Sequence, residues 1–253
     1  MSLGTRYRES ASLLFPSFPP GVKWLIVANV AVYIFNFFFF DSALHGFLLS
    51  LDLMPSAVVY RGAIWQLATY MFMHAGVLHI LFNMLALWMF GAAIEETWGT
   101  RRFLRFYFIC GVGAAVCVVL ANLAFGDPNQ RVLGASGAIY GILLAFGMLF
   151  PEQEVLLMML FPIKAKYMVM IFGAIAFLGS FQTGGTVSNL AHLGGMLVGY
   201  IYIRTQFSSR RSRGPKARFS MSGWWRDYKV RRAKKKFQVY MKRHGSDKGP
   251  WVN

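Results

Sequence analysis

The chain has 253 residues and a net charge of +16, yet only 14% of its residues are charged and 56% are hydrophobic. Uncharged runs of 17 or more residues recur along it, and each can cross the roughly 30 Å of hydrocarbon in a bilayer. This composition excludes a soluble globular enzyme and indicates a polytopic membrane protein.

Six apolar runs are long enough to cross a membrane, at residues 24–40, 77–94, 106–125, 132–150, 167–181 and 187–203. Residues 155–163 are also apolar, but nine residues that include Pro162 are too few to span, so we expect an interfacial loop. The expected fold class is therefore all-α, a polytopic bundle of six transmembrane helices. We expect three parts: an N-terminal segment at 1–21, a six-span domain at 22–206 and a basic tail at 207–253.

Basic residues flank alternate ends of these runs. With six spans, one side of the membrane receives the basic tail together with Arg6, Arg8, Lys23, Arg101, Arg102, Arg105, Lys164 and Lys166. The other side receives only Arg61 and Arg131. Because cytoplasmic connections carry the excess of Lys and Arg, both termini are expected in the cytoplasm. The connections at 41–76, 126–131 and 182–186 are then expected on the outer side.

Polar residues interrupt the apolar runs at three places. The stretch HILFN puts His79 and Asn83 on one helical face, GASG contains Ser136, and AHLGG contains His192. The predicted topology brings all four residues to one level near the outer surface. Ionisable groups inside a bilayer are costly and usually functional. A serine and a histidine at one depth are the minimal set for an activated nucleophile, since the imidazole can take the hydroxyl proton.

Two glycine pairs favour contact between the spans that carry this serine and this histidine. Gly137 and Gly141 are four residues apart in the fourth span, and Gly195 and Gly199 have the same spacing in the sixth. Small residues at this spacing let two helices approach closely. We therefore expect the fourth and sixth spans to pack backbone to backbone.

The remaining polar groups suit a dyad. Tyr140 lies one turn from Ser136 and is expected to stack on His192, while the predicted spans contain no Asp or Glu for a triad. Ser136 lies near a helix N-terminus, where unpaired N–H groups can stabilise an oxyanion. His79 and Asn83 can add side-chain donors to the same site.

Other interpretations fit each feature taken alone. A membrane serine more often packs helices than attacks a substrate, and pumps and transporters also use intramembrane histidines. A small transporter would predict polar groups at the bilayer midplane and broken helices in repeated halves. In this chain the polar groups lie near one predicted surface, and no internal repeat is visible.

Taken together, HILFNM from His79, GASG around Ser136 and AHLGG around His192, followed by Gly199, resemble the rhomboid family of intramembrane serine proteases. The resemblance covers most of residues 24–205. It implies a six-helix core, a Ser136–His192 dyad, and oxyanion stabilisation by His79, Asn83 and the Ser136 backbone. It requires no metal and no cofactor. Supporting roles are expected for Gly134, Gly137, Tyr140, Asn189, Gly195 and Gly199.

The resemblance implies hydrolysis of a peptide bond in or beside the transmembrane segment of another membrane protein, near the outer face. A six-span form of this kind is found in many prokaryotes, which implies the cytoplasmic membrane. The alternative is a catalytically silent relative that binds membrane clients, although such relatives typically lack the serine or the histidine. One departure is visible: many rhomboids have Trp-Arg in the first outer loop, whereas this chain has Trp65-Gln66, for which Arg61 is a candidate to compensate.

The tail is a separate question. Residues 222–243 interleave aromatic and basic side chains, which as a helix would present a partly apolar face among many cations. Such segments bind anionic lipid surfaces. A solvated topology signal is the alternative, and nucleic acid is not an expected partner because the tail contains no recognisable module.

Overall fold

The structure, a computed structural model, describes residues 17–39, 43–157, 161–181 and 186–211. Its contacts divide the chain into two units, Met1–Thr205 and Gln206–Asn253. The predicted tail segment at 222–243 lies outside the described residues, as does most of the predicted outer loop at 182–186. The predicted domain boundary at 206 stays a prediction.

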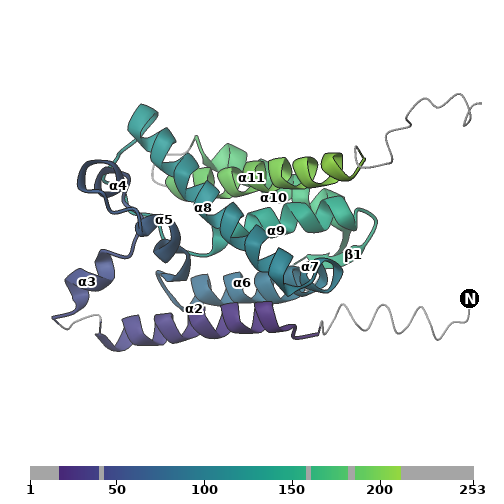
Figure 1. The fold of residues 1–253 in the computed structure, drawn as a ribbon, viewed down its shortest axis with the longest axis horizontal. Coiled ribbons are helices and arrows are strands. Elements are labelled where there is room, and N and C mark those ends of the chain that lie inside the picture. Colours follow the sequence, from purple (N-terminus) through teal and green to yellow (C-terminus); the bar gives the residue numbers. More distant parts are fainter. Residues whose placement is uncertain (1–16, 40–42, 158–160, 182–185, 212–253) are drawn as a thin grey trace, which may run out of the picture. The chain divides into compact units, whose positions relative to one another are not determined.

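The first unit is a bundle of helices (Figure 1). The main helices are α2 (Pro20–Phe39), α6 (Val77–Ala86), its continuation α7 (Ala92–Trp98), α8 (Thr100–Phe125), α9 (Ser136–Leu149), α10 (Ala165–Gly179) and α11 (Thr186–Arg211), which continues beyond this unit. A π-helical turn, η2 (Leu87–Gly91), joins α6 to α7 without a break. The shorter ones are α3 (His45–Leu49), α4 (Pro55–Arg61), α5 (Gln66–Thr69) and the 3₁₀ turn η1 (Tyr70–Phe72).

Several helices have the length and apolar character of membrane spans. Among the described residues, α2, the continuous helix from α6 to α7, and α8 have 20, 22 and 26 residues and are apolar enough to cross a membrane. Shorter apolar helices are α9 and α10. The protein is therefore a helical membrane bundle, and the count of six crossings stays a prediction.

Helix α8 forms the centre of the core. Its buried face carries Phe103, Phe106, Tyr107, Cys110, Ala114 and Val118, all fully shielded from solvent. The spacing of three or four residues puts them on one side of the helix, where α8 packs against α9 and α4. Large apolar side chains face outward instead on α2, α6 and α10, among them Phe38, Phe82 and Met170. In a bilayer these outward faces meet lipid.

The fourth predicted span begins too early. We expected it to start at Val132, but α9 begins at Ser136. Leu53 and Val132 exchange two backbone hydrogen bonds of 2.9 and 2.8 Å, which hold Val132 extended. Gly134 then turns the chain with a φ of 117°, a conformation that side chains with a Cβ rarely adopt.

Two other boundaries differ from the predictions. The described part of 155–163, expected as a loop, lies in two paired antiparallel strands, β1 (Glu154–Leu157) and β2 (Phe161–Lys164). Proline is tolerated there because a two-stranded sheet consists only of edge strands. The last helix continues to Arg211 rather than ending at Arg204, because a charge ends an apolar run without ending a helix.

Candidate active site

Ser136 is the first residue of α9. The first helical backbone bond in this turn runs from the Ile139 N–H to the Ala135 carbonyl, at 3.1 Å. The N–H groups of Ser136, Gly137 and Ala138 therefore have no acceptor within the helix. These donors and the helix dipole make this end of α9 favourable for a negative charge.

His192 on α11 faces this serine. Its Nε2 lies 2.9 Å from the Ser136 Oγ. Its Nδ1 is buried and has no hydrogen-bond partner among the described residues. The His192 ring stacks on Tyr140, with centroids 4.0 Å apart and planes 4° from parallel. The imidazole is thus oriented by stacking on an aromatic ring.

One buried carboxylate lies in a helix where the sequence predicted no Asp or Glu. We expected the second span to end at residue 94, but α7 continues to Trp98 and contains Glu95, which is buried. Its oxygens accept the N–H groups of Gly21 and Val22, each at 2.8 Å, and so cap the start of α2. His79 lies beside the residues that lead into Ser136, the partner of His192. Glu95 follows His79 by 16 residues along a continuous helix, or about 24 Å, so its carboxylate is too far away to orient His192.

The glycines of α9 and α11 lie at the contact between these helices. A Cβ on Gly195 would collide with the Gly137 carbonyl oxygen. A Cβ on Gly199 would lie 3.2 Å from the Gly141 Cα, and one on Gly141 would lie 3.1 Å from the Gly195 carbonyl. The backbones thus approach without intervening side chains, which lets the serine and the histidine meet.

His79 and Asn83 converge on the residues that precede Ser136. A Cβ on Gly134 would lie 2.7 Å from the His79 Nε2 and 3.7 Å from the Asn83 Nδ2. The His79 Nδ1 accepts the Ala75 N–H at 3.4 Å, so the tautomer that fits this bond carries its proton on Nε2. Asn83 is 7% exposed, and its Nδ2 has no partner among the described residues. Two donors are therefore available beside the serine.

Asn189, the remaining predicted position, lies on α11 one turn before His192. Its amide lies against α10, since a Cβ on Gly179 would be 2.5 Å from the Asn189 Nδ2.

Tyr70 supports the site and was not predicted from the sequence. It is 1% exposed, and its hydroxyl donates to the Gly111 carbonyl at 2.7 Å. Its own carbonyl accepts the Gly134 N–H at 2.9 Å. Tyr70 thus connects α8 to the residues that lead into Ser136. A tyrosine within an apolar stretch gives no sequence signal for these partners.

Gln66, which stands where many rhomboids have Arg, makes two hydrogen bonds. Its Nε2 donates to the Ser50 carbonyl and its Oε1 accepts the Met54 N–H, each at 3.0 Å. Arg61 is exposed and makes no hydrogen bond or ion pair with Gln66 in the described part of the chain. No contact with Gln66 supports the expected compensation by Arg61, which stays a prediction, and the Gln66 amide itself holds the loop.

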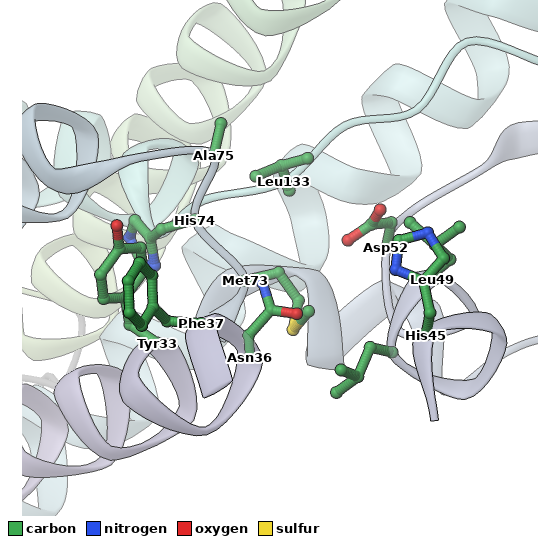
Figure 2. A pocket seen from close by; sticks show the side chains of 11 residues that line it. Tyr33, Asn36, Phe37, His45, Leu49, Asp52, Met73, His74, Ala75 and Leu133 are labelled. Carbon is green, nitrogen blue, oxygen red and sulfur yellow. The ribbon is translucent and has the colours of Figure 1, made fainter. Parts of the chain in front are cut away.

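A cavity of about 420 Å³ lies beside the loop that precedes His79 (Figure 2). Tyr33, Asn36 and Phe37 of α2 line one side, and the other lining residues are His45, Leu48, Leu49, Asp52, Met73, His74, Ala75 and Leu133. The His74 ring packs edge-on against His79, with centroids 5.1 Å apart. The cavity therefore lies next to His79, which neighbours the residues that lead into Ser136.

Asp52, at the cavity wall, makes the stability of the fold depend on pH. It is 5% exposed, and burial raises its pKa to about 6 although Arg131, at 3.6 Å, opposes this rise. A carboxyl whose pKa rises on folding weakens the fold where it is ionised, so its cost is small near pH 4 and full above pH 6. His45 and His74 line the same cavity.

We expect Asp52→Asn to gain stability relative to the parent protein as pH rises, by about 1 kcal/mol between pH 5 and pH 8. Unfolding in detergent at the two pH values measures this difference. An Asp52→Asn difference that stays constant between the two pH values contradicts the prediction.

Comparison with known proteins points to one family. A model of the Rhomboid domain matches residues 61–209. "Rhomboid protein 1, mitochondrial" of Saccharomyces cerevisiae is 34% identical over 137 residues, 52% of this chain and 38% of that protein. "Rhomboid protease GluP" of Bacillus subtilis is 29% identical over 197 residues, 76% of this chain and 36% of that protein. "RHOMBOID-like protein 1" of Arabidopsis thaliana is 33% identical over 160 residues, 60% and 38% of the two chains. The chain spans less than two fifths of the length of each of these relatives.

Proposed function

The chain belongs to the rhomboid family of integral membrane proteins, and we propose that it is an intramembrane serine endopeptidase with Ser136 as nucleophile and His192 as base. Family membership supports a protease of this type. The dyad, the site of cleavage and the active state of this chain are our proposals. The 2.9 Å separation of the Ser136 Oγ and the His192 Nε2 is the observation that carries them.

In the proposed reaction, the His192 Nε2 takes the proton of the Ser136 hydroxyl as the Oγ attacks the substrate carbonyl. The tetrahedral oxyanion accepts hydrogen bonds from N–H groups at the start of α9 and from the side chains of His79 and Asn83. His192 then gives its proton to the departing amine. A water molecule, deprotonated by the same imidazole, then attacks the acyl carbonyl, and the imidazole returns that proton to the Ser136 Oγ as the carboxylic acid product leaves.

The proposed substrates are transmembrane proteins cut in or beside their membrane segments near the outer face. A helical peptide bond shields its carbonyl, so the substrate must unwind locally before Ser136 can attack it. We propose that small residues at the cut and helix-breaking residues beyond it favour cleavage. With the basic connections on the inner side, the site opens outward, and a prokaryotic cytoplasmic membrane is the proposed location.

A catalytically silent protein that binds membrane clients is the second candidate, since the same bundle can bind a helix without cutting it. Purified full-length protein in liposomes, incubated with single-span model substrates, separates the two. We expect fragments whose new termini, mapped by mass spectrometry, lie near the outer face, and none with Ser136→Ala. Intact substrates that still bind the protein would favour the silent alternative.

The proposed oxyanion role of Asn83 predicts a catalytic rather than a structural defect. Asn83→Ala should lower kcat by about 10²–10³ with little change in KM, because its amide acts on charge that develops in the transition state. Asn122→Ala is a matched control: Asn122 is buried and donates to the Val118 carbonyl of its own helix at 2.9 Å. It should reduce stability while kcat per folded molecule stays unchanged. An Asn83→Ala variant with unchanged kcat would show that this amide is only structural.

A further inference from the structure

The connection at 43–76, predicted to be an outer loop, contains a stretch, Leu49–Leu51, whose carbonyls accept side-chain hydrogen bonds. The Ser50 carbonyl accepts the Trp65 Nε1–H at 3.1 Å and the Gln66 Nε2–H at 3.0 Å. The Leu51 carbonyl accepts the Thr69 hydroxyl at 2.8 Å. These donors all come from the same loop. These hydrogen bonds connect the stretch to α5 and to Trp65 just before it, but not to the segment that leads to Ser136.

Arg131 supplies the connection to the serine. Its Nη1 donates to the Leu49 carbonyl at 2.5 Å and lies 3.6 Å from the Asp52 carboxylate. The next residue, Val132, exchanges its two backbone hydrogen bonds with Leu53. Arg131 therefore begins a short segment, Arg131–Ala135, that attaches to the outer loop and ends at the nucleophile.

A further contact joins the loop to the connection that precedes α9, where the Ser56 N–H donates to the Pro128 carbonyl at 2.8 Å. On the other side, the cavity separates Tyr33, Asn36 and Phe37 of α2 from Leu49 and Asp52 of the loop (Figure 2). Among the described residues, this wall of the loop is therefore held by its own loop and by the connection before α9 rather than by packing across the cavity.

The energetics favour a geometric role for the Arg131–Asp52 pair. The Asp52 side chain is 7% exposed and that of Arg131 is 39% exposed. A partly exposed pair contributes little stability, and a buried carboxylate carries a desolvation cost that its partner only partly offsets. The position that the pair imposes can matter far more, because a displacement of about 1 Å at a reacting centre can cost about 10² in rate.

We propose that Arg131 is a positioning residue of the protease: by holding the Leu49 carbonyl and Asp52, it sets the segment 132–135 so that Gly134 and the Ser136 N–H face His79 and Asn83. This inference rests on the proposed function. Arg131 touches none of the reacting groups and acts through the backbone.

The test measures how fast a small fluorophosphonate phosphonylates the Ser136 Oγ, with loss of fluoride, in the full-length protein in lipid nanodiscs. A small probe does not need the entry of a substrate helix, so its rate reports the geometry of the site. We expect Arg131→Ala to slow labelling by about 10- to 100-fold and to lower kcat with KM within about twofold. Arg131→Lys should recover most of the rate, because it keeps the charge beside Asp52. Arg61→Ala, at an exposed cation of the same outer loop, is the matched control and should label at the parent rate.

Several results would overturn the proposal. One is parent-rate labelling of Arg131→Ala. Another is slower turnover of a transmembrane substrate with unchanged labelling, which would place the effect at substrate entry. A loss of labelling rate that Arg131→Lys does not recover and that follows the unfolded fraction would show a purely structural role.

If Arg131→Ala does not fold, the Asp52→Asn variant tests the proposal instead. It removes only the ion pair and should slow labelling by several-fold. Unlabelled parent protein would instead contradict the proposed function, so the two failures are distinguishable.

Discussion

Replacement of Ser136 by Ala should lower turnover of a transmembrane substrate by at least about 10⁴-fold, because no other hydroxyl takes its place at the start of α9. His192→Ala should lose a similar factor, since the neutral serine hydroxyl is a weak nucleophile without its base. Both variants should stay folded, because each removes only a few atoms from a partly exposed side chain. Initial rates in liposomes, normalised to folded protein, measure the effect.

The two residues should act as a unit. The double variant should be no slower than either single variant, because removing one member already disables the pair. Ser180→Ala is a matched control and should keep the parent rate: Ser180 directly follows α10, and its hydroxyl donates to the Phe177 carbonyl at 2.6 Å. Comparable turnover by His192→Ala and the parent would exclude His192 as the base.

Gly195→Val should cause the second large loss, in folding and activity together. A Cβ at this position would meet the Gly137 carbonyl oxygen, which belongs to a helix backbone and cannot rotate away. Forcing the two helices apart costs about 1–3 kcal/mol or more, and it also separates the serine from the histidine. Thermal unfolding in detergent and turnover per folded molecule should both fall, with activity down by about 10²-fold.

Other glycines provide graded comparisons. Gly199→Val should be less severe than Gly195→Val, because a Cβ at Gly199 finds its nearest neighbour at 3.2 Å. Gly46→Ala, in α3, should be close to neutral, since a Cβ there meets nothing within 4 Å. A Gly195→Val protein as stable and active as the parent would show that α9 and α11 are not in backbone contact.

The sequence predicts the bounds of a helix well where a long apolar run by itself determines the helix. The runs at 24–40, 106–125 and 167–181 match α2, α8 and α10 to within a few residues at most ends. The motifs also name the residues that the structure brings together at the start of α9. Glycine spacing carries that information, because only small residues permit the approach of two backbones.

Features that depend on distant partners could not be predicted in this way. The start of α9 depends on the pairing of Val132 with Leu53, 79 residues earlier in the sequence. The amide of Gln66 is polar and buried, and its two backbone partners have no pattern that marks them. Neither the hydropathy nor the motifs indicate that Tyr70 joins α8 to Gly134. The catalytic roles of the site residues stay predictions.

Covalent labelling of the full-length protein in a bilayer tests the proposed mechanism most directly. Fluorophosphonate treatment followed by peptide mapping should find one adduct, on Ser136. Labelling should vanish in Ser136→Ala and become much slower in His192→Ala, because the base is needed to activate the hydroxyl. An adduct elsewhere that persists in Ser136→Ala, or a folded and proteolytically active protein that never acquires an adduct on Ser136, would contradict a Ser136–His192 protease.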